Sequence, residues 1–238
     1  MFPAPIGMKV ISYSLFGTDP KYRSGMAANI RLALDLYPGW EVRVHHDGAA
    51  GPEVEAAAAE CGNARLVDMS SCRLPGMFWR FLPFEGVDRL VVRDADSRLT
   101  RRERAAVDEW VADATRLHLM RDHPHHSYLV MGGMWGLVPD RDLSPLAEAY
   151  VGGRGLPLDA RMVDMDFLRD VVYPLYCGDS TVHCSLAELS VEPHARPFPC
   201  RMEGFGFVGE IFGADGVRAY QWEVWRDRAV DELTRVAY

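Results

Sequence analysis

Residues 89–99, with the sequence RLVVRDADSRL, decide the predicted fold and the candidate site. The apolar residues 90–92 predict a buried strand, and two aspartates, Asp94 and Asp96, follow at its exit. Side chains two positions apart in extended backbone point to the same face, so we expect the two carboxylates to lie side by side. Because like charges repel, a metal ion, the flanking arginines, or water and backbone donors must hold them together.

The composition of the 238-residue chain is typical of a soluble globular protein, with 48% hydrophobic and 25% charged residues. A net charge of -8 argues against nucleic acid or an anionic membrane as the main partner. We find neither a signal-peptide pattern nor an apolar run of about 18 residues, and therefore expect a cytoplasmic protein without a membrane span. Five cysteines without CxxC spacing predict reduced thiols.

Predicted strands and helices alternate over the first 115 residues, which indicates an α/β layer with a largely parallel sheet. Strands are expected at 8–15, 41–47, 64–69 and 90–93, and helices at 26–36, 53–60 and 101–114. In such sheets ligands bind at the carboxyl ends of the strands, where Asp47 and Asp94 fall. The less regular second half predicts strands at 116–120 and 127–138 and helices at 143–150 and 160–171, with no clear domain boundary.

Asp94 and Asp96 permit several interpretations. They suit a hard divalent cation, Mg²⁺ or Mn²⁺, that bridges two phosphates of a nucleotide. They equally suit a capping turn in which Ser97 and Thr100 cap a helix and arginines screen the charge. A phosphatase with a nucleophilic aspartate normally needs a downstream lysine, and none follows Lys21. A glycosidase pair is disfavoured because neighbouring residues of one strand cannot easily face each other across a sugar.

Several motifs between Val10 and Phe212 carry a resemblance to a known family. In chain order they are VISYSLFGTDPKYRSGMAANIRLALDLYPGWEVRVHHDG, MFWRFLPF, VVRDADSR, EWVADATRLHLMRDHPHHSYLVMGGMWG, DMDFLRDVVYP and FVGEIF. Together they resemble a group of bacterial and viral glycosyltransferase-like proteins of the GT-A fold. The resemblance implies a single GT-A-like domain, with a Rossmann-like nucleotide-binding half over about 8–98 and an irregular acceptor-side half and C-terminal tail over about 99–238.

The activity implied by the resemblance is that of a metal-dependent hexosyltransferase. It would move a sugar from a nucleotide-diphosphate donor, of the UDP or GDP type, to a saccharide or small-molecule acceptor. Asp94 and Asp96 would hold the cation, Mn²⁺ or Mg²⁺, and the diphosphate, with Arg80 and Arg93 nearby as anion partners. Arginine suits that role because it is permanently charged and contacts phosphate oxygens through two N–H groups.

Two further groups of residues would contact the donor. Four residues at strand ends correspond to positions that cradle the nucleobase and ribose in similar enzymes: Ser12, Tyr13, Ser14 and Asp47. Asp47 equally suits a simple turn in the sequence HDG. In MGGMWG, the paired glycines, among them Gly133, would bring backbone close to the donor sugar or acceptor, and Trp135 would offer a face to a sugar ring. The alternative for Trp135 is a core tryptophan beside a bulge.

The segment DMDFL lies where similar proteins usually carry Asp-Gln, and an acid there touches donor-sugar hydroxyls near the anomeric carbon. Asp164 is the favoured catalytic residue, together with Arg80. Met165 stands at the glutamine position and removes an amide. Asp166 either compensates for that loss or is a solvent-facing helix residue.

Histidines complete the predicted site. His183 resembles part of a His-Asp-Ser element and would complete the metal shell, but Cys184 replaces the aspartate. A packed structural histidine is the alternative. The loop HLMRDHPHH does not match a zinc site and is expected to line the acceptor side of the cleft, with Asp122 and His123 as candidate contacts. Because no general base is evident, we expect retention of configuration. A protein that binds a nucleotide sugar without turnover is the alternative function.

Overall fold

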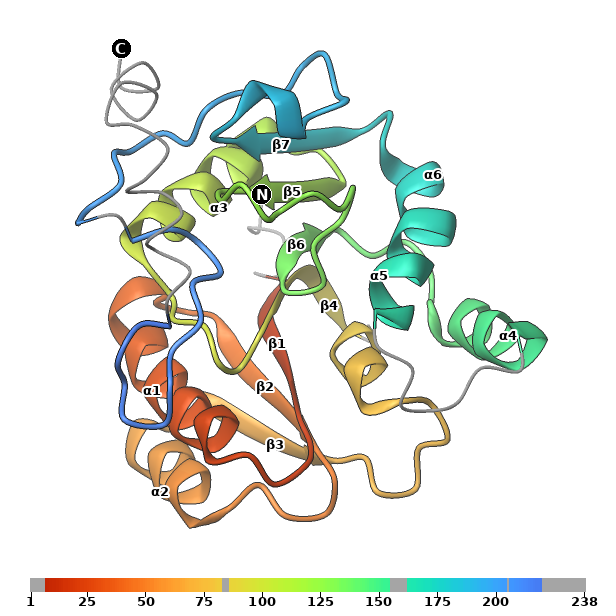
Figure 1. Cartoon of the computed structure of the whole chain (residues 1–238). Helices are drawn as coiled ribbons and strands as arrows, with labels where there is room; N and C mark the ends of the chain where they lie inside the picture. The colour runs from red at the N-terminus through yellow and green to blue at the C-terminus, as the bar shows by residue number, and fades with distance from the viewer. Residues whose placement is uncertain (1–6, 83–85, 155–161, 205, 220–238) are drawn as a thin grey trace, which may run out of the picture.

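The computed structural model describes residues 7–82, 86–154, 162–204 and 206–219. Across these ranges the chain forms a seven-stranded sheet with the order β3-β2-β1-β4-β6-β5-β7 (Figure 1). The strands are β1 (Met8–Leu15), β2 (Glu41–His46), β3 (Ala64–Asp68), β4 (Val87–Arg93), β5 (Leu117–Arg121), β6 (Met134–Leu137) and β7 (Ser180–Cys184). The predicted α/β class with one sheet is confirmed.

The sheet is parallel in its first half and mixed in its second. β1 pairs in parallel with β2 and with β4, and β2 pairs in parallel with β3. β6 runs antiparallel to both β4 and β5, and β5 pairs in parallel with β7. The parallel strands place the chain segments that follow β1, β2 and β4 at one edge of the sheet, where ligands of α/β proteins bind.

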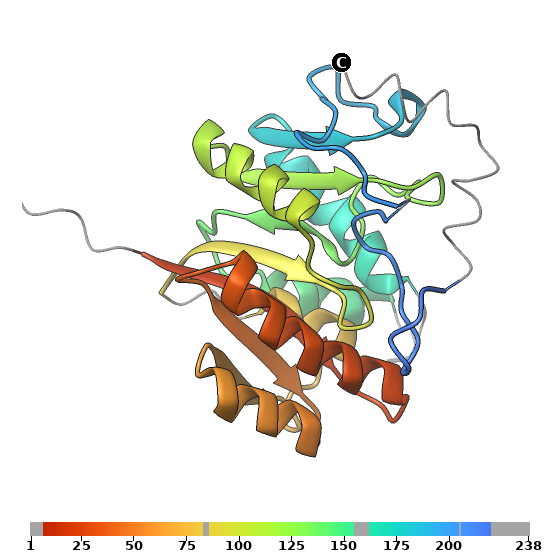
Figure 2. The ribbon, with the colours of Figure 1, turned by 90° about the vertical axis from the view of Figure 1, so that its left-hand side faces the viewer.

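Helices cover both faces of the sheet. α1 (Pro20–Leu36), α2 (Pro52–Cys61) and α3 (Arg101–Asp113) lie on one face (Figures 1 and 2). The other face carries a 3-10 helix, η1 (Gly76–Phe81), and a continuous helical segment. That segment comprises α5 (Val163–Phe167), a π-helical turn η2 (Leu168–Val172) and α6 (Tyr173–Tyr176). α4 (Ser144–Arg154) lies beyond η1 and α5 at the periphery, and η3 (Ala187–Leu189) follows β7.

Alternating strand side chains supply the two larger cores of the described chain. Val10 and Val92 belong to the core beneath η1 and α5, which also contains Phe81 and Phe167. Ile11 belongs to the core beneath α1, α2 and α3, together with Met26, Ile30, Val42, Val54, Val91, Val107 and Trp110. This alternation decides toward which of the two cores each side chain at the end of β4 points.

Several element boundaries differ from the predictions. α1 begins at Pro20 because Asp19 caps it through the Lys21 backbone N–H and Pro20 occupies the first turn. The strand expected at 127–138 shortens to β6, and the strand β7 was not predicted. The helix expected at 160–171 is described only from residue 162 onward and extends to Tyr176.

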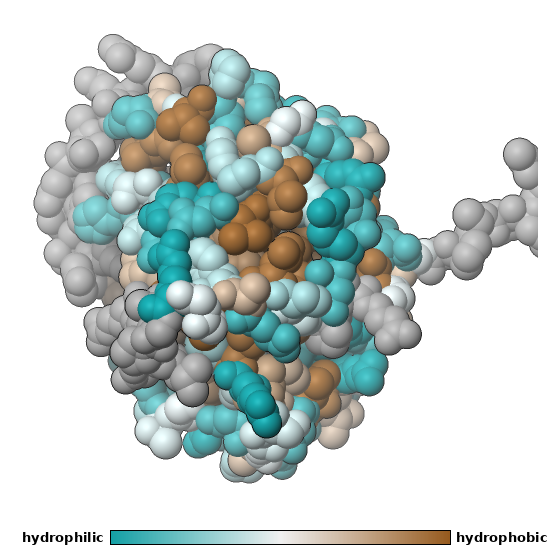
Figure 3. All heavy atoms as spheres, turned by 90° about the vertical axis from the view of Figure 1, so that its right-hand side faces the viewer, coloured by the Kyte–Doolittle hydropathy of each residue, from teal (hydrophilic) through white to brown (hydrophobic). Residues whose placement is uncertain are grey.

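The face that carries α4, α5 and α6 shows a band of apolar side chains between hydrophilic ones (Figure 3). Partly buried residues of these helical segments pack against the core beneath them: Leu146, Tyr150, Val151, Val171 and Tyr173. Within the described ranges, none of the helices combines the length and apolar character that crossing a membrane requires.

Candidate functional site

The two aspartates at the exit of β4 lie in a turn. The Ser97 backbone N–H and hydroxyl both donate to the Asp94 carbonyl, at 3.3 and 2.9 Å. Asn29, a fully buried residue of α1, holds the same turn by donating to the Ser97 carbonyl at 2.9 Å and accepting from the Leu99 N–H at 3.0 Å. The strand alternation that we expected to align Asp94 with Asp96 therefore ends at Arg93, and the turn determines the two carboxylate positions.

Arg80 is the centre of the site. It lies in η1, is buried, and its Nη1 donates to Asp94 Oδ1. Its Nη2 donates to Asp164 Oδ2 at 3.0 Å, which links the turn after β4 to helix α5. The Arg80 backbone N–H donates to Ser14 Oγ at 3.0 Å and so ties η1 to the end of β1. Arg80, Asp94 and Asp164 are thus brought together, as expected.

Burial and neighbouring charges shift the pKa values of Arg80 and Asp164. Burial alone lowers the pKa of Arg80, but the charges of Asp94 and Asp164 outweigh it and raise that pKa overall. Burial raises the pKa of Asp164, and the charge of Arg80 opposes the rise. One buried cation thus partly compensates two carboxylates, of which Asp164 is buried and Asp94 is exposed.

Asp96 has a cation of its own. Lys21 Nζ, from the first turn of α1, donates to Asp96 Oδ2 at 2.9 Å. The Asp96 side chain is 10% exposed, whereas the Asp94 side chain is 44% exposed. Burial and the charge of Asp94 raise the pKa of Asp96, and Lys21 opposes that rise. The cations that pair with the two carboxylates are Arg80 and Lys21, in place of the flanking arginines that we considered.

The paired glycines let backbone approach this charged group. A Cβ atom on Gly133 would lie 2.1 Å from Asp94 Oδ2 and 2.7 Å from the Asp94 backbone nitrogen. A Cβ atom on Gly132 would lie 2.8 Å from Arg80 Nη2 and 2.9 Å from Asp164 Oδ2. A side chain at either position would displace the groups that form the site.

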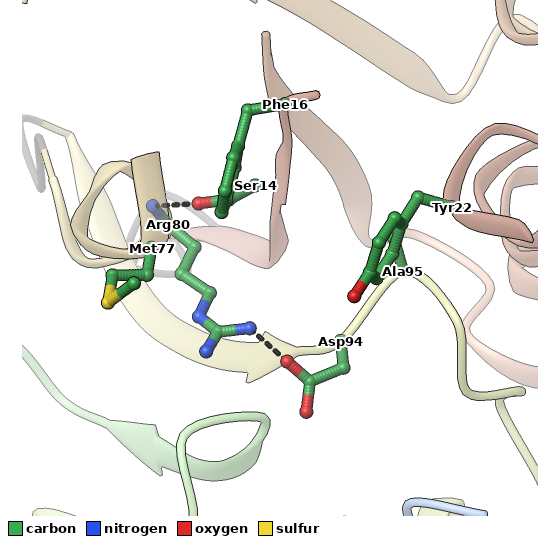
Figure 4. Close-up of a pocket in the computed structure, with 7 residues that line it drawn as sticks. All are labelled: Ser14, Phe16, Tyr22, Met77, Arg80, Asp94 and Ala95. Atoms are coloured by element: carbon green, nitrogen blue, oxygen red, sulfur yellow. Dashed lines mark hydrogen bonds and ion pairs between the residues drawn. The ribbon is translucent and has the colours of Figure 1, made fainter. Parts of the chain in front are cut away.

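Two cavities meet at Asp94. The first, which we call the aromatic cavity, is lined by Ser14, Phe16, Tyr22, Met77, Arg80, Asp94 and Ala95. In Figure 4 the rings of Phe16 and Tyr22 lie on two sides of this cavity, and the Arg80–Asp94 ion pair lies along a third. The second, the histidine cavity, is lined by Tyr22, Asp94, Asp96, His123, His125, His126, Met131, Met134, Gly209 and Ile211. Tyr22 and Asp94 line both cavities.

The residues expected to cradle a nucleobase have different environments. Ser14 lines the aromatic cavity. Ser12 and Tyr13 are fully buried in β1, and Ser12 Oγ lies 3.4 Å from His45 Nδ1. The structure therefore corrects the assignment of Ser12 and Tyr13 as contact residues. Asp47 is exposed, and its Oδ2 accepts from the Gly17 N–H at 3.0 Å, which fixes the loop after β1.

Arg93 does not face the site. Strand alternation turns it toward the core beneath α1 and α3, where it is 2% exposed. Its Nε donates to Glu103 Oε1 at 2.5 Å, and its Nη1 donates to the Trp135 carbonyl at 3.1 Å. Tyr37 also donates to Glu103. Arg93 is therefore the buried counter-charge of Glu103, in place of the anion partner that we expected.

The structure also corrects the expected roles of Trp135 and Asp166. The Trp135 side chain is fully buried and packs edge-on against Phe81, so the core alternative describes it. Asp166 pairs with Arg169 one turn later in the helical segment, at 2.7 Å. It lines neither of the two cavities and does not compensate for Met165, whose side chain packs beside Gly132.

His183 belongs to a separate buried network. Its Nδ1 lies 2.9 Å from His118 Nε2, and its Nε2 lies 3.0 Å from Glu109 Oε2 on α3. The His183 side chain is fully buried, and it lines neither cavity. The packed structural histidine, which the sequence left open as the alternative, describes this residue.

Histidines of the histidine-rich loop line the second cavity, but Asp122 does not. Asp122 is fully buried, accepts two hydrogen bonds of 2.8 Å from Arg102, and accepts one from the Val208 N–H at 2.9 Å. It anchors the loop. His126 Nδ1 accepts from the Asp122 N–H, and burial lowers the pKa of His126 to about 3. His126 is therefore uncharged at neutral pH.

Four contributors to the site were not predicted: Lys21, Tyr22 and Phe16, which surround the turn, and Asn29, which holds it. A usable signal existed for Lys21 and Tyr22. They begin the helix that follows the first strand, near the edge where ligands of parallel sheets bind, and Lys21 is one of only two lysines in the chain. No comparable signal marks Asn29, because its role depends on a contact between residues far apart in sequence.

The chemistry of Asp94 and Asp96 fits a hard divalent cation. Mg²⁺ in particular takes one or two carboxylates and completes its shell with phosphate and water. Both aspartates line the histidine cavity, and Asp94 is accessible. In the described part of the chain, no group of three or more His, Cys, Asp or Glu side chains could hold a metal. The residues present therefore fit a cation held by two carboxylates, Asp94 and Asp96, without His183.

No family model and no curated protein matches the chain. Among solved structures, the galactosyltransferase LgtC, in complex with donor and acceptor sugar analogs, is similar with a TM-score of 0.49 and 15% identity, over 78% of this chain and 81% of that one. A glycosyltransferase involved in glycosylation of the major capsid of PBCV-1 has a TM-score of 0.45 and 12% identity, over 74% and 81%. The mannosyltransferase PcManGT from Pyrobaculum calidifontis, with GDP-Man and Mn²⁺, has a TM-score of 0.47 and 12% identity, over 97% and 63%.

Proposed function

We propose that the chain is a glycosyltransferase that moves a sugar from a nucleotide-diphosphate donor, of the UDP or GDP type, to a saccharide or small-molecule acceptor. The observation that carries this proposal is the ion-paired group of Asp94, Arg80 and Asp164, which lies where the aromatic and histidine cavities meet. A donor and an acceptor bound in adjoining cavities would bring their reacting atoms together at this group.

The aromatic cavity has the character of a nucleoside site. Phe16 and Tyr22 offer ring faces on which a planar base can stack, as aromatic side chains do for bases of single-stranded nucleic acids. Ser14 adds a hydroxyl at the end of β1. A base placed there would direct the diphosphate toward Asp94, and so toward the turn after β4.

The proposed chemistry follows from charge. As the bond from the anomeric carbon to the phosphate oxygen breaks, the sugar becomes positively charged and the electron pair stays on the diphosphate. Asp164 would stabilise the developing positive charge, and Arg80 would contact the departing phosphate oxygens through its N–H groups. Because both side chains are buried and paired, they are already oriented before the reaction.

Asp94 and Asp96 would hold Mn²⁺ or Mg²⁺. Such a cation, when bound, supplies Lewis-acid stabilisation of the diphosphate. The Asp94 carboxylate would then contact both the cation and Arg80. Because the Asp94 side chain is partly exposed, a cation can reach it while Arg80 stays paired.

The histidine cavity is the proposed acceptor site. His123 Nδ1 accepts from the His125 N–H and His126 Nδ1 accepts from the Asp122 N–H. When the His126 ring is neutral, its proton is therefore on Nε2. We propose that the acceptor oxygen bonds to the anomeric carbon while the departing phosphate oxygen takes the acceptor proton, with retention of configuration.

A phosphatase with an aspartate nucleophile is the competing enzyme class. Its nucleophile would be Asp94, the first carboxylate of the pair, with a lysine beside it. The one lysine at this turn, Lys21, contacts the second carboxylate, Asp96, and Asp94 is paired with Arg80. This arrangement favours transfer of a glycosyl group over formation of an aspartyl phosphate.

The test is hydrolysis of a panel of UDP- and GDP-sugars in Mn²⁺, followed as release of nucleoside diphosphate. We expect slow release from at least one donor, and its loss in Asp94→Asn but not in Asp108→Asn, which changes an exposed aspartate of α3. Release from no donor, with nucleotide still bound, would indicate a binding protein without turnover. The departure at Met165 is the observation that favours this second candidate.

A further inference from the structure

Lys21 contacts Asp96, one of the two carboxylates proposed to hold the cation. Its ammonium group lies 2.9 Å from Asp96 Oδ2 and 4.6 Å from the centre of the Tyr22 ring. The Lys21 side chain is 27% exposed, so solvent reaches it while the carboxylate it holds is nearly buried. The ion pair joins two residues that are 75 positions apart in the sequence.

The two cations leave the site close to charge balance. Arg80 is shared between Asp94 and Asp164, and Lys21 serves Asp96 alone. A divalent cation on Asp94 and Asp96 would therefore add positive charge beside two resident cations. A diphosphate bound at the same time supplies the negative charge that compensates for it. Cation and diphosphate are thus expected to bind together far better than the cation alone.

We propose that Lys21 is a donor-binding residue: it balances Asp96 in the empty site and contacts the diphosphate when the nucleotide binds. The proposal rests on the proposed function, because it assumes a nucleotide diphosphate at this turn. A flexible ammonium group with three donors can change partner without moving the backbone, which a buried arginine such as Arg80 cannot do as easily.

If the Lys21 ammonium group changes partner in this way, two consequences follow. Part of the affinity for UDP or GDP persists without any divalent metal, because Lys21 still contacts the diphosphate. Free Mn²⁺ without nucleotide binds weakly, because Lys21 competes with it for Asp96. Removing the ammonium group should weaken the first interaction and strengthen the second.

The experiment measures binding of UDP and GDP by calorimetry in excess EDTA, and binding of Mn²⁺ alone by the electron paramagnetic resonance signal of the free ion. The variant is Lys21→Met, with Lys21→Gln as a second replacement in case the first does not fold. Lys9→Met is the matched control, because Lys9 is the other lysine and lies beside Trp40 at the start of β1.

In EDTA we expect Lys21→Met to weaken nucleotide binding by about tenfold or more, the size of one charge-assisted contact, and Lys9→Met to bind as the wild type does. We expect Lys21→Met to bind Mn²⁺ alone several times more tightly. Nucleotide affinity in EDTA within about twofold of the wild type would overturn the proposal. So would a wild type that binds nucleotide in Mn²⁺ and not at all in EDTA. Binding in neither condition would overturn the proposed function as well.

Discussion

Arg80 donates a hydrogen bond of 3.0 Å to Asp164, a residue 84 positions later in the chain. This bond joins η1, which lies between β3 and β4 in the chain, to the helical segment that lies between β6 and β7. Because Arg80 also pairs with Asp94, both halves of the molecule contribute to one ion-paired group. The site thus depends on the complete fold.

Replacing Arg80 tests how much this group contributes to stability. Arg80→Met leaves Asp164 buried without its cation, so we expect a loss of roughly 3 to 5 kcal/mol in the free energy of unfolding. Chemical denaturation measures it. Arg169→Met is the control: it removes a solvent-exposed partner of Asp166 and Asp170, so the loss of stability should be much smaller. Equal losses in the two variants would contradict the central role of Arg80.

Gly133→Ala tests the close approach of backbone to the site. The added Cβ atom would lie 2.7 Å from the Asp94 backbone nitrogen, so rotation of the Asp94 side chain cannot relieve the contact. We expect nucleotide affinity to fall at least about tenfold, measured by calorimetry. Gly153→Ala is the control, because the added Cβ atom in α4 would have no neighbour within 4 Å outside the backbone of its own helix. It should retain full affinity and gain up to about 1 kcal/mol of stability.

Glu103→Gln separates the buried Arg93 pair from binding. The change leaves the Arg93 charge buried without a counter-charge, so we expect roughly 3 to 5 kcal/mol of destabilisation. Nucleotide affinity of the folded fraction, measured at low temperature, should stay within about twofold of the wild type. A large loss of affinity with unchanged stability would restore Arg93 as an anion partner.

His45 makes stability depend on pH. Burial lowers its pKa from 6.5 to about 4, so the unfolded chain takes up a proton before the folded chain does. The stability that the folded state gains from keeping His45 neutral is fully present above about pH 6.5 and is lost as the pH falls toward 4. Between about pH 7.5 and 5 the wild type should lose roughly 2 kcal/mol more than His45→Asn. Parallel urea denaturation curves at the two pH values measure this difference, and equal losses would contradict it.

The parallel half of the fold was predictable because its signals are local. Alternating apolar strands and periodic helices place Asp94 at a strand exit, and the paired glycines mark the close approach that Gly133 makes. The ordered motifs around Asp94 also placed Arg80 and Asp164 in one site. These predictions did not require the details of any side-chain contact.

The failures concern side-chain direction and distant contacts. Arg93 and Trp135 lie in strands whose faces are assigned only when the helices have packed. His183 pairs with His118 across neighbouring strands, which no spacing in the sequence predicts. The ion pair of Lys21 with Asp96 was not predicted, because it joins the first helix to the exit of β4, 75 positions later in the chain.

Calorimetric titration of UDP and GDP, with and without Mn²⁺, tests the proposed function most directly, using the wild type and Asp94→Asn. We expect one of the nucleotides to bind more tightly in Mn²⁺, and Asp94→Asn to lose that metal-dependent gain while its circular dichroism stays that of the wild type. Binding of neither nucleotide in either condition, or equal metal-dependent affinity in the two proteins, would contradict a nucleotide-sugar site at Asp94.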